Sequence, residues 1–255
     1  MEQILQVFFN AAIFERAWPF LARGVGMTVA LSLVIVPIGL ASGLAVAMLY
    51  HLHRRWLNRF LMAYVDFFRA MPLLLLILFS AFGLPKYGVN LPVFWYLVLA
   101  LTAYNGAVLG EIFRAGILSL DRGQSEAAFS IGLGYWQAML LVVIPQAARR
   151  MIPAIVSQLV TLLKDTSLGS VIAYEELLRR GRINGEYFHN TLQSLIVVAA
   201  MYIVVNFTLS RLARRLETRQ RRRYQAGSIS VTGVEDLAVL EAHTVAAASD
   251  ATMTV

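Results

Sequence analysis

The chain has 255 residues, of which 58% are hydrophobic and only 15% are charged, and its mean hydropathy is +0.65. Soluble domains carry about 25% charged residues, so this composition excludes an ordinary soluble protein and indicates an integral membrane protein. The absence of cysteine excludes disulfides and thiolate chemistry, and the net charge of +7 comes from basic residues beside apolar segments, which favours membrane orientation over nucleic-acid binding.

The first twenty residues are amphipathic, but they do not form an apolar run long enough to cross a bilayer. Apolar residues recur there at helical spacing, and Glu2, Glu15 and Arg16 interrupt them. We therefore expect residues 1–21 to form a helical segment at the membrane interface. Glu2 stands where a cleavable signal peptide would carry a basic residue, which argues against such a signal.

Five later segments have the length of about 20 mostly apolar residues that a spanning helix needs. They are Met27–Leu49, Phe60–Phe82, Pro92–Leu118, Met151–Ala173 and Thr191–Leu212. We therefore predict an all-α membrane protein with about five transmembrane helices, in which residues 22–215 form the transmembrane domain.

Basic residues concentrate in three regions beside these segments. They are Arg54, Arg55 and Arg59, then Arg122, Arg149 and Arg150, and finally the run Arg211–Arg223. With five spans all three regions lie on one side, which the positive-inside tendency makes cytoplasmic. The N-terminus is then outside and the C-terminus in the cytoplasm of a cell (plasma or inner) membrane.

Two features near the C-terminus complete this topology. Arg179, Arg180 and Arg182 would lie outside, against the positive-inside tendency, because no further apolar segment supplies a sixth span. Residues 216–255 are basic at first and then polar and weakly patterned. We expect them to form a disordered cytoplasmic tail.

The loop between the third and fourth spans, residues 121–150, contains the sequence QSEAAFSIGLGYWQAMLLVVIP. Glu126 to Ile131 can form one short helix and Tyr135 to Ile144 a second, joined by a turn at Gly132 and Gly134, which have no Cβ. Such a pair of helices predicts a compact docking element, although an ordinary amphipathic loop would also fit the residues.

The combination of Glu-Ala-Ala, a glycine six residues after the glutamate and a terminal proline resembles the EAA loop of ABC importer permeases, which fits a groove on a cytoplasmic ATPase. The runs FFRAMPLL and PQAARRMIPAIVSQLVTLLKDTSL are similar to those of permeases for polar amino acids. The resemblance covers roughly Gly24 to Arg215. It implies a type I ABC importer permease fold with cytoplasmic EAA coupling helices and these ATPase-coupling residues: Glu126, Ala127, Ala128, Gly132, Tyr135 and Pro145.

The resemblance also implies function and partners. The chain would form half of an alternating-access pore for polar amino acids. The Tyr104-Asn105 pair and the Glu175–Arg179 run are similar to glutamate-type permeases. The implied partners are an ATPase dimer that carries ATP and Mg, a second permease subunit (an identical chain or a paralogue), membrane lipid, and an extracytoplasmic amino-acid-binding protein that would contact Lys86 and Arg179–Arg182.

The chain itself is not expected to be an enzyme or to hold a cofactor. It lacks the GxxxxGK[ST] phosphate-binding loop, and no Ser, His and Asp set suggests catalysis. Its four histidines have no spacing typical of a metal site.

An acidic residue stands in the fourth span. An Asp in mid-span costs about 2.5–3.5 kcal/mol on insertion scales, so Asp165 needs compensation. Ser167 and Gly169 can relax the helix there, and broken spans bind the charged ends of substrates. The resemblance implies that Asp165, Thr166 and Ser167 face the translocation path. We expect Asp165 to bind the substrate ammonium group or to fix a cationic neighbour; a salt bridge from it or from Lys164 to another span is the alternative.

Three further residues are candidates for substrate contact. Arg69 lies three residues after Asp66 on one helix face, and it either pairs with that carboxylate or binds the substrate carboxylate. The hydroxyl of Thr28 either reaches the path or bonds to the carbonyl four residues back. Asn105 contacts either the substrate or another helix.

A similar spacing occurs in Glu111 and Arg114, late in the third span. We expect these two residues to form a structural ion pair that transmits loop movement.

Two other functional classes fit a multispan chain. An ion-gradient-driven secondary transporter would show internal repeats, and none is evident. A membrane receptor or scaffold subunit needs only the spans and a cytoplasmic contact. Co-purification with an ATPase separates the importer from both.

Overall fold

The computed structural model describes residues 11–50, 52, 54–212, 214–215 and 218. Residues 1–10 and nearly all of the predicted tail lie outside this range. Every regular element in the described part is a helix, and the described residues up to Arg211 belong to one compact unit. This confirms the predicted all-α class.

The first helix, α2, runs from Ala11 to Tyr50 and is therefore much longer than the predicted span from Met27 to Leu49. A helical backbone satisfies its own hydrogen bonds, so the exposed Glu15 and Arg16 interrupt the apolar run without ending the helix. At 1.5 Å per residue, α2 is roughly 60 Å long. It thus exceeds the bilayer's hydrocarbon core of about 30 Å.

The second predicted span, Phe60–Phe82, is not one straight helix. Helix α3 (Arg55–Ala70) is followed by α4 (Leu73–Leu78), the π-helix η1 (Phe79–Gly83) and the 3₁₀-helix η2 (Leu84–Tyr87), with a bend of 100° between the two parts. Pro72 explains the break, because a proline disfavours the helical conformation of the preceding residue. Met71 is accordingly extended, with φ −76° and ψ 131°.

Helix α5 (Val93–Leu118) is the centre of the fold and contacts α2, α3, α4 and α8. One buried cluster includes Leu31, Ile35, Leu97 and Leu101, and a second lies nearer to α6, α7 and the start of α8. In the second cluster, a Cβ on Gly116 would lie 2.0 Å from Cγ of Met151. Glycine at this position therefore lets α5 and α8 approach closely.

The loop between the third and fourth spans contains α6 (Arg122–Ser130) and α7 (Tyr135–Ala138). From Tyr135 onward the chain is helical without interruption to Ile172: α7 leads into the π-helix η3 (Met139–Val143), then α8 (Ile144–Asp165) and the 3₁₀-helix η4 (Thr166–Ile172). The second loop helix predicted for Tyr135–Ile144 is thus the beginning of the fourth span.

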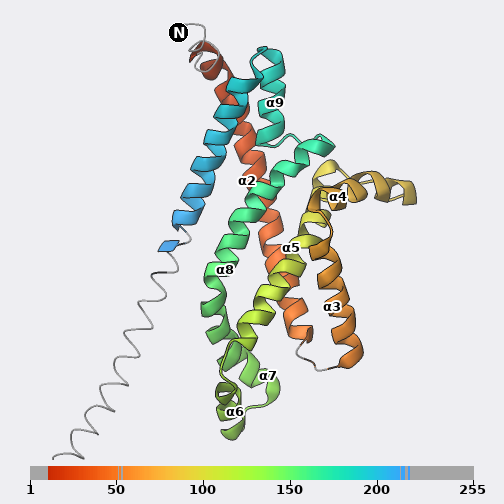
Figure 1. Ribbon diagram of the computed structural model, residues 1–255, viewed down its shortest axis with the longest axis vertical. Coiled ribbons are helices and arrows are strands. Elements are labelled where there is room, and N and C mark those ends of the chain that lie inside the picture. Colours follow the sequence, from red (N-terminus) through yellow and green to blue (C-terminus); the bar gives the residue numbers. More distant parts are fainter. Residues whose placement is uncertain (1–10, 51, 53, 213, 216–217, 219–255) are drawn as a thin grey trace, which may run out of the picture. The chain divides into compact units, whose positions relative to one another are not determined.

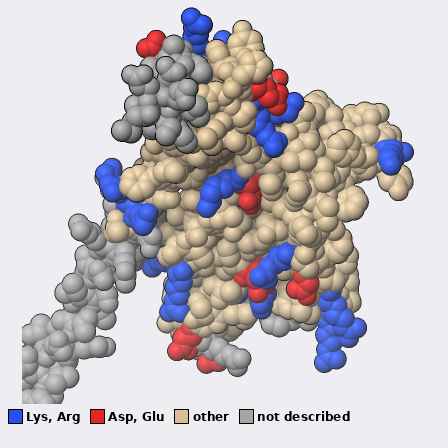
Figure 2. All heavy atoms as spheres, turned by 45° about the horizontal axis from the view of Figure 1, so that its top comes forward, with Lys and Arg blue, Asp and Glu red and all other residues tan. Residues whose placement is uncertain are grey.

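Helix α9 (Leu177–Tyr187) precedes a last helix, Thr191–Leu212. Four helices are long and apolar enough to cross a membrane, and the bent pair α3 and α4–η2 brings the number to five among the described residues. Figure 1 shows α9 at the opposite end of the unit from α6 and α7. The visible surface in Figure 2 is largely uncharged, and acidic and basic side chains gather in a few patches.

Candidate functional site

In the docking element formed by α6 and α7, the turn at Gly132 is where the sequence predicts it, but α6 begins at Arg122, four residues before the predicted Glu126. The side chain of Asp121 caps α6 by accepting a hydrogen bond from the Gly123 amide at 2.9 Å. At the other end, Gly132 has a φ of +83°, a left-handed conformation that glycine adopts without a Cβ penalty. The Gly134 amide then donates to Oε1 of Gln137 at 2.9 Å, at the start of α7.

The predicted coupling residues differ in what they offer to another protein. Glu126, Ala127 and Gly132 are exposed, whereas Tyr135 and Pro145 are partly buried. Ala128 is only 3% exposed. Its side chain therefore serves the packing of this chain, and the surface that another protein can approach is carried by Ala127 and its exposed neighbours.

Sequence reasoning missed the apolar part of this surface. Phe129, Ile131 and Trp136 are 46%, 78% and 45% exposed and surround the glycine turn. Exposed apolar groups of this size are typical of contact surfaces. The same residues in an amphipathic loop would ordinarily be assigned to the buried face, so only the fold reveals their exposure.

Hydrogen bonds join the docking element to the start of α8, and the start of α8 to the end of α5. Nε2 of Gln146 donates to Oε1 of Gln124 at 2.9 Å, and the Arg150 guanidinium donates to the carbonyl of Ser119. The element is thus held to the fourth span, which is itself held to the end of the third.

A polar pair connects α5 with α8 in the middle of the fold. Nε2 of Gln158 donates to Oδ1 of Asn105 at 2.9 Å, and Nδ2 of Asn105 donates to the Leu101 carbonyl at 2.8 Å. Asn105 is completely buried. The expected helix contact of Asn105 is therefore present, and its partner Gln158 is a residue that sequence analysis did not single out.

Asp165 is the last residue of α8, after which the helix tightens into the 3₁₀-helix η4 without a break, so the helix type changes there but the relaxed, broken span that the sequence suggested is not seen. It is partly buried, and within the described part of the chain it makes neither an ion pair nor a hydrogen bond through its side chain. The alternative salt bridge to another span is thus not seen there. Gln158 and Asp165 are seven residues apart and so lie on one face of α8, together with Thr161.

The neighbours of Asp165 have different surroundings. Thr166 is fully buried, and its hydroxyl donates to the Leu163 carbonyl at 2.7 Å. Ser167 is partly buried. Thr166 therefore supports the change from α8 to η4 with its own side chain.

Thr28 lies beneath α9, at the end of the unit opposite to α6 and α7. It is 2% exposed, and its hydroxyl accepts a hydrogen bond from the Leu177 amide at 3.3 Å. The neighbouring Glu176 is fully buried and accepts hydrogen bonds from the amides of Leu178 (2.7 Å) and Arg179 (2.8 Å) and from the Tyr202 hydroxyl (2.6 Å). These contacts join α2, α9 and the last helix.

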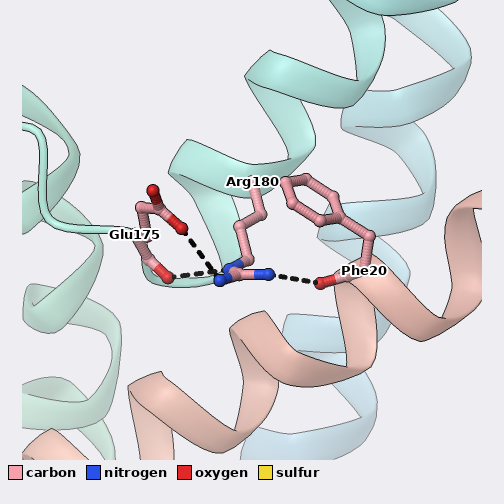
Figure 3. A network of polar contacts seen from close by, with 3 residues as sticks. All are labelled: Phe20, Glu175 and Arg180. Atoms are coloured by element: carbon pink, nitrogen blue, oxygen red, sulfur yellow. Dashed lines mark hydrogen bonds and ion pairs between the residues drawn. The ribbon is translucent and has the colours of Figure 1, made fainter.

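Burial raises the pKa of Glu176, while the hydrogen bonds from Tyr202 and the two amides oppose this shift. A second contact holds the same end (Figure 3): Nη2 of Arg180 pairs with Glu175 at 2.8 Å, and Nη1 donates to the Phe20 carbonyl at 3.3 Å. The Arg180 guanidinium also lies 4.6 Å from the Phe20 ring centroid. Arg180, one of the basic residues that were predicted to lie on the outside of the membrane, is thereby neutralised by Glu175 of the same chain.

Arg69 lies in a different place from Asp165. It lines a cavity of about 260 Å³ between α2, α3 and α5, together with Asp66, Glu111 and Arg114. The expected pair of Glu111 and Arg114 is present, with contacts of 2.8 Å and 2.5 Å. The alternative pair of Asp66 and Arg69 is absent from the ion pairs of the described residues.

The six substrate-contact candidates therefore fall into separate groups: Asp165 and Ser167 with Thr166 at the change from α8 to η4, Asn105 with Gln158, Thr28 beneath α9, and Arg69 in the cavity. No group of three metal-ligating side chains occurs in the part of the chain that the structure describes. Of the histidines, only His189 belongs to that part, and it is exposed.

Comparison with known proteins gives consistent matches. Residues 35–222 match the family model described as binding-protein-dependent transport system inner membrane component. The chain is 39% identical over 218 residues to a probable glutamine ABC transporter permease protein of Bacillus subtilis, covering 83% of this chain and 99% of that protein. It is 40% identical over 170 residues to a glutamate transport system permease protein of Corynebacterium glutamicum, covering 66% and 62%.

Among solved structures, the chain is similar to that of an amino acid ABC transporter crystallised with histidines. The TM-score is 0.77 and the identity 32%, over 82% of this chain and 98% of the other. A more distant match, a methionine ABC transporter in inward-facing conformations, has 21% identity and a TM-score of 0.63, covers 79% of this chain and 98% of the other, and supports the fold alone.

Proposed function

We propose that this chain, which belongs to the family of binding-protein-dependent transport system inner membrane components, is the pore-forming subunit of an ATP-driven importer for polar amino acids. The family and the helical fold are established by the matches above. The substrate, the coupling residues and the partner subunits are what the proposal adds.

The observation that carries the proposal is the docking element of α6 and α7. It projects Glu126 and Ala127 and the exposed Phe129, Ile131 and Trp136 around one glycine turn. A compact surface of aromatic and aliphatic side chains beside a carboxylate suits a groove on another protein. An ATPase that binds this surface would reach the fourth span directly, because α7 begins the uninterrupted helical stretch that ends at Ile172.

The proposed path for the substrate lies along the polar face of α8. Gln158 and Asp165 lie on this face, and Asn105 of α5 contacts it through Gln158. The carboxylate of Asp165 suits a substrate ammonium group, and the partly buried Gln158 amide, which the buried Asn105 holds in place, suits uncharged polar groups. Because Asp165 has no ionic partner among the described residues, its charge is available for a ligand.

The substrate class follows from this chemistry and from the relatives. The names of two relatives specify glutamine and glutamate. A path with an amide group and one carboxylate favours a substrate whose side chain is an uncharged amide, since a glutamate side chain would bring a second carboxylate near Asp165. We therefore rank glutamine above glutamate, in contrast to the glutamate-type resemblance of the sequence.

The proposed assembly contains two permease subunits, two ATPase subunits that bind ATP and Mg, and an amino-acid-binding protein. A single set of five spans supplies one docking element and one polar face, so a second permease subunit would complete the path. The end with α6 and α7 would face the cytoplasm, and α9 would face the outside, where the binding protein docks. The N-terminus is then outside and the C-terminus inside.

The test is co-purification followed by transport. The full chain is expressed with candidate ABC ATPase and amino-acid-binding proteins from the same organism, and the purified complex is reconstituted in liposomes. ATP-dependent glutamine uptake in a complex of two permease and two ATPase chains is expected. Uptake that requires an ion gradient and no ATPase would instead support a secondary transporter, and an assembly without transport would support a receptor.

A further inference from the structure

The cavity between α2, α3 and α5 is separate from the polar face of α8 and holds four charged side chains. The cavity lies near the C-terminal ends of α2 and α5. Tyr50 and Arg114 are among the residues that line it. Two of its charges neutralise each other, because Arg114 makes two contacts with Glu111. Arg114 also lies 5.3 Å from the centroid of the Tyr50 ring, so its cation is fully engaged.

The other two charges, Asp66 and Arg69, are exposed and make no ion pair with any residue that the structure describes. Both belong to α3, which is part of a candidate membrane span. Charged side chains in a span are costly unless they are compensated. Glu111 attracts Arg69 across the cavity without forming an ion pair with it, and no described residue pairs with Asp66, so a ligand can bind both charges.

The arrangement of these two charges specifies the ligand. Residues three apart on a helix have Cβ atoms about 5–6 Å apart, so the cavity presents one cation and one anion side by side. A ligand with an anionic group and a protonated amine a few bonds away matches both. A purely anionic ligand would pair with Arg69 but would be repelled by Asp66.

The remaining lining of the cavity is apolar and includes Val46, Leu61 and Val65. The volume of about 260 Å³ lies slightly below the range of about 300–1,000 Å³ that is typical of pockets for drug-sized ligands. This size suits a small head group whose apolar remainder extends into the bilayer. A soluble zwitterion would leave the apolar lining without a partner.

We propose that this cavity binds the head group of a phospholipid that carries a primary amine, with the phosphate on Arg69 and the ammonium on Asp66. Phosphatidylethanolamine has this chemistry. Phosphatidylglycerol lacks the ammonium group, and phosphatidylcholine has a quaternary ammonium that cannot donate a hydrogen bond to a carboxylate.

The experiment measures lipid retention by native mass spectrometry of the full chain. The protein is purified in detergent and supplied in turn with phosphatidylethanolamine, phosphatidylglycerol and phosphatidylcholine. The wild type is expected to retain phosphatidylethanolamine in preference to the other two lipids. Equal retention of all three would overturn the proposal, as would displacement of the lipid by free glutamine, which would identify the ligand as a soluble amino acid.

Two variants separate the roles of the charges. Arg69→Gln should weaken retention of phosphatidylethanolamine by about ten- to a hundredfold, as expected for the loss of one hydrogen bond to a charged group. Asp66→Asn should abolish the preference over phosphatidylglycerol. Arg69→Lys keeps the cation and should restore binding, which distinguishes a lost charge from a misfolded chain. Arg59→Gln removes a cation from the same helix outside the cavity and should change nothing; a loss equal to that of Arg69→Gln would refute the assignment.

Discussion

Gly132 allows a direct test of the docking element, because its φ of +83° is a backbone conformation that side chains with a Cβ rarely adopt. The turn it forms closes α6, with hydrogen bonds of 2.9 Å from the Gly132 amide to the Phe129 carbonyl and 3.2 Å from the Leu133 amide to the Ala128 carbonyl. A Cβ at this position would meet no atom within 4 Å. The change Gly132→Val therefore introduces backbone strain without a clash, at a cost of about 1–3 kcal/mol.

The chain offers a matched control at Gly88. Its φ is also +83°, and a Cβ there would likewise meet no atom within 4 Å. Gly88 follows η2, away from α6 and α7. Gly88→Val should therefore cost about as much stability as Gly132→Val, without changing the surface of the docking element.

The assay is the ATPase activity of the reconstituted complex, stimulated by the binding protein and substrate. In the Gly132→Val complex, the binding protein and substrate should stimulate ATPase activity much less. Less of the ATPase subunit should also stay bound to the permease during purification. Gly132→Asn should keep both, because asparagine tolerates the left-handed conformation, and Gly88→Val should keep both as well. Normal stimulation in Gly132→Val, or an equal loss in Gly88→Val, would refute the reasoning.

Further predictions concern the path, the α9 end and the assembly. Asp165→Asn is nearly isosteric and should reduce uptake without lowering the melting temperature; a lower melting temperature with normal uptake would show a structural role. Gln158→Ala leaves the buried amide oxygen of Asn105 without a partner and should destabilise the chain by about 1–3 kcal/mol in thermal unfolding; an unchanged melting temperature would count against the pair. Glu176 has a raised pKa in the folded chain, so its contribution to stability is complete below its ordinary pKa of 4.5 and is lost as the pH rises through the raised value. Glu176→Gln should make the free energy of unfolding less dependent on pH in that range. An unchanged pH dependence would show that other groups cause it. Light scattering of the purified complex should give the mass of two permease and two ATPase chains, and an active complex with one permease chain would disprove the paired path.

The sequence was most informative where local chemistry decides the structure. The glycine turn at Gly132 depends on a few adjacent residues and is present, whereas the helix after Asp165 changes to a tighter 3₁₀ form instead of relaxing. The length of the apolar segments predicted which parts of the chain form spans, but it did not predict the residues at which the helices begin and end. Helix α2 includes Glu15 and Arg16, well before the predicted start at Met27, because charged side chains outside the hydrocarbon region leave a helical backbone intact.

Other features depended on packing that a single sequence does not specify. Pro72 breaks the helix of the second predicted span, but the resulting bend of 100° is accompanied by packing of α4 against α5 and η4, which the sequence does not specify. The partner of Asn105 is 53 residues away in sequence. Likewise, the isolation of Arg69 from Asp165 follows from the positions of three helices around a cavity.

The unbroken helical stretch from Tyr135 to Ile172 has a mechanical consequence. Near its middle, Met151 lies against Gly116, where the close approach of α5 and α8 provides a fulcrum. At 1.5 Å per residue, the arms from Met151 to Tyr135 and to Asp165 are roughly 24 Å and 21 Å long. A lever with nearly equal arms reverses the direction of a sideways displacement and preserves its amplitude. A displacement of the docking element by a few ångströms would therefore move the carboxylate of Asp165 by a similar distance in the opposite direction.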